Sequence, residues 1–272
     1  MAAPPIRSYL FVPATRPERI AKAKASGAGA VIVDLEDAVA PQDKTRARDA
    51  LVTALSNGKG LLVRINGAET EWFDDDLRMC ASLGVDGIVL PKAERPEQIR
   101  QVGARLGSLA IVLPIIESAQ GYAALPVLCA ESPVPRVAFG SIDFQLDLGI
   151  EGEDEQLAFF RSGIVLASRL AGRQPPVDGV TVEIDDAERL RADTLRGKRM
   201  GFGAKLCIHP KQVAPVNACF SPSVEEVAWA HRIVDAAAAA GNAAVAIDGK
   251  MVDRPVIVKA ERVLSEAGEG GA

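Results

Sequence analysis

The chain has few aromatic residues, few histidines and no excess of positive charge, and each of these shortages excludes a class of protein. Phe, Trp and Tyr make up 4% of the 272 residues, which argues against a surface on which nucleic-acid bases stack. Lys and Arg number 31 against 36 Asp and Glu, so the net charge is −5 and no basic stripe for DNA or RNA is visible. We therefore expect small-molecule partners and no nucleic acid.

Cysteine pairs at the spacing of a zinc or redox site are also absent. The four cysteines (Cys80, Cys129, Cys207 and Cys219) stand at irregular distances, which predicts reduced, buried thiols in a cytoplasmic protein. The first residues show no basic segment followed by an apolar core, so no secretory signal is expected. The longest apolar runs, such as residues 110–116, are too short to cross a bilayer, and no membrane partner is expected.

Short apolar runs alternate with amphipathic helical stretches along most of the chain. The predicted strands cover residues 8–12, 30–35, 61–65, 87–90, 111–116, 136–139, 179–182 and 205–208. The predicted helices cover residues 16–25, 42–55, 74–82, 97–105, 155–171, 186–200 and 224–240. This alternation implies a parallel sheet, and so many strands in this length favour an α/β fold of the (β/α)8 TIM-barrel class.

A doubly wound open sheet is the alternative fold. No glycine-rich dinucleotide motif follows the first predicted strand, where that fold would place one, so the closed barrel is preferred. We expect the catalytic barrel over residues 1–246. Residues 247–272 form a short C-terminal extension, predicted as a turn, a link and a last helix.

Charged or polar residues follow nearly every predicted strand, at the end where parallel barrels carry their active sites. They are Asp34 to Asp37, Arg64 with Asn66, Lys92, Glu117, Asp143 and His209. Carboxylates that converge in one cleft repel each other unless a cation joins them. Glu36, Glu117 and Asp143 would therefore need a positive partner, and two carboxylates on adjacent strands with water in the remaining positions suit a hard divalent ion such as Mg²⁺.

The basic residues at the strand ends suggest how a substrate is held. Arg64 is predicted to anchor a substrate carboxylate, because a guanidinium group offers two parallel hydrogen bonds. Lys92 is predicted to neutralise the carboxylates or to hold a substrate oxygen. A Schiff base on Lys92 is the weaker alternative, because nearby carboxylates keep its ammonium charged. His209 and Asp147 are interpreted as structural residues, one hydrogen-bonded at the last strand and the other a local cap.

Eight segments match one protein family, in the family's order. They are RSYLFVPATRPERIAKA at 7–23, VDLEDAV at 33–39, LVRINGAE at 62–69, VLPKAE at 89–94, PIIESAQG at 114–121, AFGSIDFQLDLG at 138–149, CIHPKQV at 207–213 and GKMVDRPVIVKA at 249–260. On these segments the chain resembles the citrate lyase β-subunit-like branch of the metal-dependent barrel lyases and aldolases, a group that includes the malyl-CoA lyases.

The resemblance implies roles for the residues at the strand ends. The family's metal ligands fall on Glu117 and Asp143, with Mg²⁺ as the cofactor. Its substrate arginine falls on Arg64. Glu36 matches the acidic residue that orients a metal-bound water or the substrate.

Residues outside the strand ends acquire implied roles too. Asp253 matches an aspartate that acts as a general acid in the site of a neighbouring subunit. The C-terminal segment would then dock on that subunit, which implies a homo-oligomer, a trimer or hexamer in this family. Arg7 and Arg16 lie in a region that approaches the CoA phosphates in relatives.

The implied activity is that of a Mg²⁺-dependent carbon–carbon lyase. Such an enzyme would cleave or form a 3-hydroxyacyl-CoA, with acetyl-CoA or another acyl-CoA and a 2-oxo acid such as oxaloacetate, glyoxylate or pyruvate on the other side of the reaction. A class II pyruvate aldolase that does not use CoA is one alternative. A subunit of a multi-protein lyase that needs an acyl-carrier partner is the other.

Overall fold

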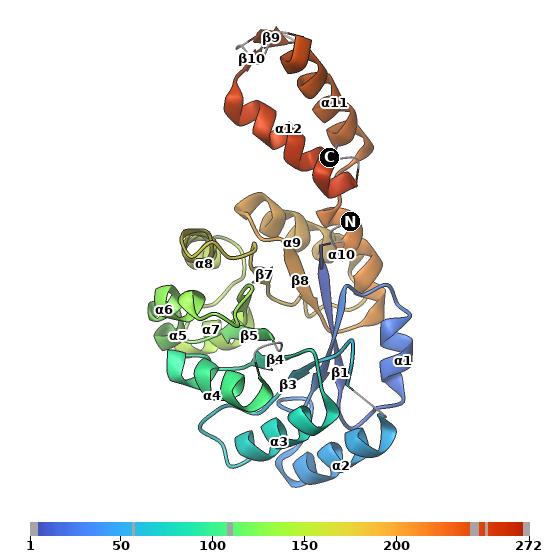
Figure 1. Cartoon of the computed structure of the whole chain (residues 1–272), viewed down its shortest axis with the longest axis vertical. Helices are drawn as coiled ribbons and strands as arrows, with labels where there is room; N and C mark the ends of the chain where they lie inside the picture. Colours follow the sequence, from blue (N-terminus) through green and yellow to red (C-terminus); the bar gives the residue numbers. More distant parts are fainter. Residues whose placement is uncertain (1–4, 56–57, 108–110, 240–244, 248–249, 269–272) are drawn as a thin grey trace. The chain divides into compact units, whose positions relative to one another are not determined.

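The strands of the structure close into a parallel barrel (Figure 1). The computed structural model describes residues 5–55, 58–107, 111–239, 245–247 and 250–268. The strands pair in sequence order, and β8 pairs back to β1. They are β1 (Ser8–Pro13), β2 (Ala30–Asp34), β3 (Leu62–Arg64), β4 (Gly87–Leu90), β5 (Ile111–Ile116), β6 (Ala138–Phe139), β7 (Val177–Asp178) and β8 (Ala204–Cys207). The predicted (β/α)8 TIM barrel is confirmed.

The barrel interior is filled by apolar side chains from every strand. One buried cluster takes Tyr9, Ile32, Leu62, Val89, Leu113, Ile115, Ala138, Val177, Ala204 and Leu206. A parallel strand covered on both faces needs a nearly continuous apolar run, and β2 shows this with the sequence AVIVD. Strand ends are the places where polar groups enter this framework.

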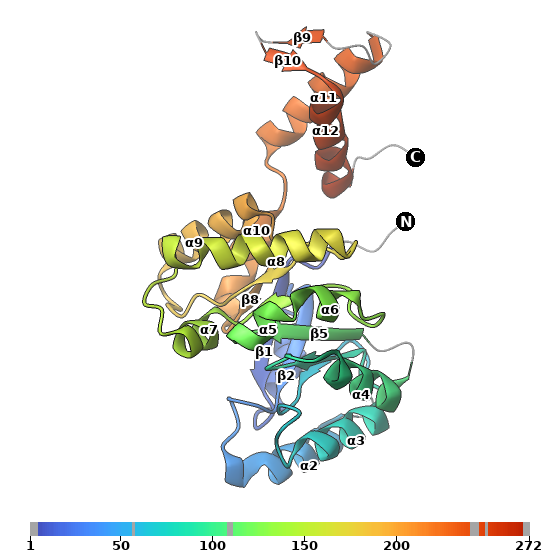
Figure 2. The same cartoon turned by 90° about the vertical axis from the view of Figure 1, so that its left-hand side faces the viewer.

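Helices cover the outside of the strands (Figures 1 and 2). They are α1 (Arg19–Lys24), α2 (Lys44–Ala54), α3 (Phe73–Leu83), α4 (Pro96–Leu106), α5 (Ala119–Ala123), α6 (Leu125–Ala130), α7 (Ser141–Leu148), α8 (Ala158–Leu170), α9 (Ala187–Met200) and α10 (Val213–Phe220). Short 3-10 turns precede α2, α8 and α10, at Pro41–Asp43, Glu155–Leu157 and Pro210–Gln212.

The seventh strand differs from its prediction. It lies at Val177–Asp178, so the expectation of a strand over residues 179–182 is wrong. The residues after Asp178 are held by side chains instead of a strand ladder: Gly179 N donates to Asp178 Oδ1 at 2.9 Å, and Thr181 Oγ1 donates to Asp193 Oδ2 at 2.8 Å. The apolar residue Val180 lines a cavity, which explains why this stretch resembles a strand in sequence.

The described residues from Ala218 onward form a second compact unit, while the barrel unit covers Ile6–Asn217. In the second unit α11 (Val224–Ala239) and α12 (Arg254–Ala267) pack side by side, and β9 (Val245–Ile247) and β10 (Lys250–Val252) form an antiparallel hairpin (Figure 2).

This division differs from the predicted boundary after residue 246. The reason is that α11 buries Ala230, Ile233 and Ala237 with α12. Residues 248–249, where a turn was predicted, lie outside the described residues. No helix in the described part of the chain has the length and apolar character needed to cross a membrane.

Candidate active site

A cavity of about 340 Å³ opens at the carboxyl ends of the strands. Its wall includes the last residues of β1, β2 and β3 (Pro13, Asp34 and Arg64) and the first residues of α7. Apolar side chains supply much of the remainder, among them Phe11, Ile115, Phe139, Val180 and Leu206. The cavity therefore places a small group of charged side chains against an apolar wall, as expected for a small-molecule site.

Glu117 follows β5 directly and is positioned by two backbone segments. Its side chain lies in the cavity wall although the residue is only 4% exposed. Lys92 N donates to Glu117 Oε1 at 2.7 Å. On the other side, a Cβ on Gly140 would lie 2.5 Å from Glu117 Oε2. The carboxylate can occupy this position only because residue 140 has no side chain.

Lys92 contributes its backbone to this arrangement. Its φ of 47° lies in the left-handed region, which is uncommon for a residue with a Cβ and aims the amide at Glu117. Its side chain is exposed and does not line the cavity. Its ammonium still lowers the pKa of Glu36 through its charge. Lys92 therefore acts on the acidic residues through its charge and its backbone amide, and its role toward a substrate stays a prediction.

The two glutamates of the site have raised pKa values. Burial raises the pKa of Glu117 to about 8, and the charges of Glu36 and Asp143 add to the shift. Burial likewise raises the pKa of Glu36 to about 7, opposed by the charge of Arg64. The structure thus brings both Glu36 and Asp143 within electrostatic reach of Glu117, as the strand-end pattern predicted.

Arg64 ends β3 and is surrounded by acidic side chains. Its Nε and Nη2 donate to the two oxygens of Asp34 at 2.7 and 2.6 Å. Its Nη1 lies 2.8 Å from Glu36 Oε2 without hydrogen-bond alignment, and 3.2 Å from Asp37 Oδ2. Burial by itself would lower the pKa of Arg64. The hydrogen bonds to Asp34 and the neighbouring negative charges outweigh it and raise this pKa above the ordinary value.

The geometry around Arg64 bears on its predicted role as a substrate anchor. One edge of the guanidinium, Nε with Nη2, is bound to Asp34. Nη1 faces the acidic side chains of Glu36 and Asp37. The role of Arg64 toward a substrate stays a prediction.

Asp143 lies in the first turn of α7 and lines the same cavity. The helix is tied to the segment that carries Glu117, because Ala119 N donates to Asp147 Oδ2 at 2.7 Å. Asp147 therefore caps the start of α5, in agreement with its expected role as a cap. His209 is likewise structural, since its Nδ1 accepts a hydrogen bond from Lys211 N at 3.2 Å.

The residues present fit a hard divalent cation. Glu117 Oε2 faces the space that a side chain on residue 140 would fill, and a buried carboxylate with a raised pKa gains from a nearby positive charge. In the described part of the chain no group of three or more His, Cys, Asp or Glu side chains could hold a metal. A pair of carboxylates with water and substrate oxygens in the other positions suits an ion such as Mg²⁺.

Two predicted substrate-binding residues of the barrel unit, Arg7 and Arg16, are not part of the cavity wall. Arg7 precedes Ser8, the first residue of β1, and so lies at the end of this strand opposite to Pro13 and the cavity. Arg16 lies beyond the cavity end of β1, where its exposed side chain pairs with Glu18. The structure therefore does not bring Arg7 to the cavity, and Arg16 does not line it.

Asp253 belongs to the second unit, where it is the N-cap residue of α12. Its side chain forms no capping hydrogen bond, which leaves the carboxylate available for another role. His231 lies on α11 in the same unit with an exposed side chain.

Sequence reasoning missed the polar residues that support the site. Asp34 accepts a hydrogen bond from Glu36 N at 3.0 Å and also binds Arg64, a partner that the sequence does not indicate. Arg161 was not singled out. The available signal was its place among Leu157, Ile164 and Ser168 on the buried face of the α8 region, where a charged residue needs a partner.

Comparison with known proteins identifies relatives of this chain. Residues 7–210 match the family model described as HpcH/HpaI aldolase/citrate lyase. A citrate lyase subunit beta-like protein of Deinococcus radiodurans is 36% identical over 285 residues, covering 97% of this chain and 99% of the relative. A (3S)-malyl-CoA thioesterase of Cereibacter sphaeroides is 35% identical over 271 residues, covering 97% of this chain and 95% of the relative.

A solved structure extends the similarity to three dimensions. The protein CitE of Mycobacterium tuberculosis, in complex with magnesium, acetoacetate and coenzyme A, superposes with a TM-score of 0.87 at 35% identity. The superposition covers 98% of this chain and 99% of that one. The barrel, the acidic strand ends and these matches lead to one assignment: the chain belongs to the HpcH/HpaI aldolase/citrate lyase family.

Proposed function

We propose that this chain is a Mg²⁺-dependent carbon–carbon lyase that cleaves or forms a 3-hydroxyacyl-CoA. The products of cleavage would be an acyl-CoA, acetyl-CoA in the simplest case, and a 2-oxo acid. The observation that carries the proposal is the position of the buried Glu117 carboxylate. It lies next to Gly140, where a Cβ would be 2.5 Å from Oε2, and within electrostatic reach of Asp143. The magnesium bound by the M. tuberculosis relative supports the choice of ion.

Glu117 and Asp143 would hold the ion. When bound, Mg²⁺ would supply a Lewis acid for the oxygen on the carbon that becomes the keto carbon. The remaining steps move protons and one electron pair on the substrate. The 3-hydroxyl loses its proton, the C2–C3 bond breaks, its electron pair moves to the thioester as an enolate, and that enolate takes a proton at carbon.

Arg64 would stabilise negative charge on a substrate oxygen during this sequence. Asp34 fixes its guanidinium by two bonds, so the group needs little reorganisation when charge develops nearby. Glu36 and Asp37 would leave Nη1 when the oxygen binds. Glu36, whose pKa is about 7, would then be suited to exchange a proton near neutral pH.

The proton on the acetyl carbon is assigned first to Asp253 and second to Glu36. The absence of a capping bond on the Asp253 side chain supports this assignment. If Asp253 acts in the site of a neighbouring copy, the second unit docks on that copy and the enzyme is a homo-oligomer.

Complementation tests this arrangement directly. Glu117→Ala and Asp253→Ala should each be inactive alone. A mixture of the two in equal amounts, refolded together, should recover about a quarter of the wild-type activity, because a quarter of the sites then combine two intact halves. No recovery, with normal oligomer formation, would remove Asp253 from the neighbouring site.

Hydrolysis of the thioester is a second candidate, favoured by the similarity to the C. sphaeroides malyl-CoA thioesterase. One assay separates the possibilities. Candidate hydroxyacyl-CoAs are incubated with and without EDTA, and acetyl-CoA, free CoA and 2-oxo acid are quantified. EDTA-sensitive release of acetyl-CoA with oxo acid supports the lyase, and release of free CoA supports the thioesterase.

The same assay covers the two alternatives that the sequence left open. A CoA-independent aldolase would release pyruvate from a hydroxy-oxo acid in the absence of CoA. A carrier-dependent subunit would bind Mg²⁺ and oxo acid but leave free CoA esters intact.

A further inference from the structure

The cavity residue Asp143 depends on its helix for its position. In the part of the chain that the structure describes, the Asp143 carboxylate accepts no hydrogen bond. A metal ligand generally needs an oriented side chain or an oriented backbone. Here the orientation must come from α7, so the contacts that fix α7 decide where this carboxylate points.

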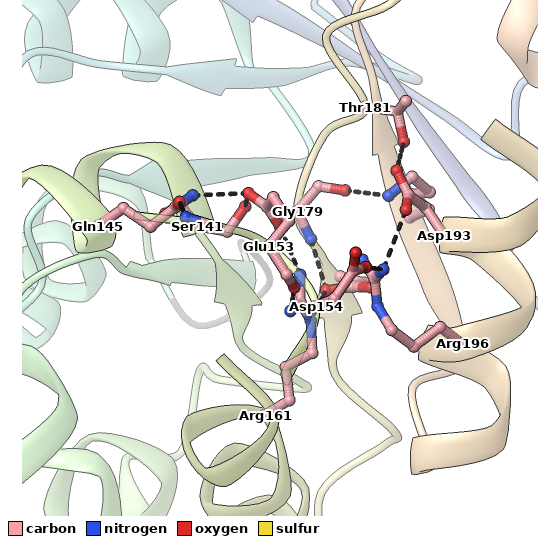
Figure 3. A network of polar contacts seen from close by, with 12 residues as sticks. Ser141, Gln145, Glu153, Asp154, Arg161, Gly179, Thr181, Asp193 and Arg196 are labelled. Carbon is pink, nitrogen blue, oxygen red and sulfur yellow. Dashed lines mark hydrogen bonds and ion pairs between the residues drawn. The ribbon is translucent and has the colours of Figure 1, made fainter. Parts of the chain in front are cut away.

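Glu153 binds two side chains of α7, those of Ser141 and Gln145 (Figure 3). Ser141 Oγ donates to Glu153 Oε1 at 2.8 Å, and Gln145 Nε2 donates to the same oxygen at 2.7 Å. These two residues lie two positions before and two positions after Asp143 on the helix. Gln145 also closes the loop, because its Oε1 accepts from Gly152 N at 3.2 Å. One carboxylate oxygen therefore clamps the first turns of α7.

Arg161 fixes the other half of Glu153. This arginine of α8 is 1% exposed, and its Nη2 donates to Glu153 Oε2 at 2.8 Å while its Nη1 donates to Glu153 O at 2.7 Å. Its Nε donates to Asp178 Oδ1 at 3.0 Å. The guanidinium also lies 5.4 Å from the ring centre of Phe139, a residue of the cavity wall.

The hydrogen-bond network extends from Arg161 and Asp178 to Gly179, next to the part of the cavity wall that follows β7 (Figure 3). Lys205 Nζ donates to Gly179 O at 2.7 Å, and Gly179 N donates to Asp178 Oδ1 at 2.9 Å. Gly179 packs so closely on α7 that a Cβ there would lie 2.5 Å from Ser141 Oγ. Ser141 is thus confined between Gly179 and Glu153.

We propose that Glu153 is a positioning residue for Asp143, held in its working orientation by Arg161. The inference rests on the proposed function in one respect, that Asp143 is a metal ligand. Neither Glu153 nor Arg161 lines the cavity, so their effect on the metal passes through α7. Buried ion pairs give little net stability compared with apolar packing, so their value at this place is the geometry that they impose.

The test compares three variants of the full chain by calorimetric titration with MgCl2 and by thermal melting. Glu153→Gln leaves one oxygen for the two α7 donors and Arg161, so it cannot satisfy all three. Gln145→Ala removes one clamp bond from a residue that does not line the cavity. Asp154→Asn is the matched control, because it removes the adjacent negative charge, which pairs with Arg189 and Arg196 instead of α7.

We expect Glu153→Gln to raise the Mg²⁺ dissociation constant at least about tenfold, the usual effect of losing a support behind a metal ligand. Gln145→Ala should raise it by a smaller factor, and the double variant should bind no more weakly than Glu153→Gln alone. Asp154→Asn should stay within about twofold of the wild type.

The inference is overturned if Glu153→Gln melts at a lower temperature but binds Mg²⁺ within about twofold of the wild type, because its role is then structural only. Equal weakening by Asp154→Asn would also overturn it, since the effect would then be one of general charge. If Glu153→Gln does not fold, Gln145→Ala decides by the same twofold criterion. Failure of the wild type to bind Mg²⁺ would instead refute the proposed function.

Discussion

Replacement of Gly140 by alanine is the sharpest test of the metal site, because the added Cβ would meet Glu117 directly. It would lie 2.5 Å from Glu117 Oε2, 2.6 Å from Glu117 Cβ and 2.8 Å from Ile115 Cγ2, so both side chains must give way. An ordinary contact needs about 3.4 Å or more, so the carboxylate must move by roughly 1 Å. The backbone of residue 140 has φ −89°, which alanine tolerates, so conformational strain does not enter.

A movement of this size exceeds what a metal site accepts. Ligand distances hold to about 0.2 Å, so we expect Gly140→Ala to weaken Mg²⁺ binding at least 10- to 100-fold. The overpacking should lower the free energy of unfolding by about 1–3 kcal/mol. Calorimetric titration measures the first effect, and urea denaturation measures the second.

Gly67→Ala is the matched control for this variant. Gly67 also follows a barrel strand, and among the described residues no atom lies within 4 Å of the Cβ it would gain. It should bind Mg²⁺ like the wild type. If Gly140→Ala binds Mg²⁺ as tightly as the control, Glu117 does not ligate the ion from the position that the structure gives it.

Three further outcomes are expected. Glu117→Ala should abolish Mg²⁺ binding and keep a cooperative melting transition, and loss of folding would count against the site. Arg64→Lys should weaken the affinity for a 2-oxo acid while Mg²⁺ binding is retained, and unchanged oxo-acid affinity would reject Arg64 as a substrate-binding residue. The same substitution should lower the free energy of unfolding by about 1–3 kcal/mol, because lysine cannot satisfy both oxygens of buried Asp34. Glu117 must ionise to bind a cation, and its pKa is about 8. The affinity for Mg²⁺ should therefore fall about tenfold per pH unit below pH 8 and level off above pH 8. Equal affinities at low and high pH would refute the role of Glu117 as the ligand.

The positions of the site residues were predictable because they follow from strand periodicity. An apolar run marks a buried strand, and the next residue must lie at its carboxyl end. This reasoning placed Arg64, Glu117 and Asp143 around one opening, and the cavity wall confirms that placement. Their roles in metal and substrate binding stay predictions.

The partners of these residues were not predictable in the same way. Asp34 and Arg64 are direct neighbours in the β2–β3 register, and this register is fixed by packing of the whole barrel. The selection of Glu153 depends on the fold as well. It lies in the acidic run from Glu151 to Glu155, and no local pattern shows which of these carboxylates reaches α7.

The short β6 and β7 strands explain why the barrel needs such side-chain contacts near its site. The two strands share one register pair, Ala138 with Val177, so few backbone hydrogen bonds hold this part of the wall. Arg161 bridges the gap by binding Asp178 of β7 and the loop residue Glu153 together. The position of α7 therefore depends on a buried ion pair more than on the strand ladder. Substitutions at residues that never contact a substrate should for this reason change metal binding, whereas substitutions behind the longer β1, with its five register pairs to β2, should change only stability.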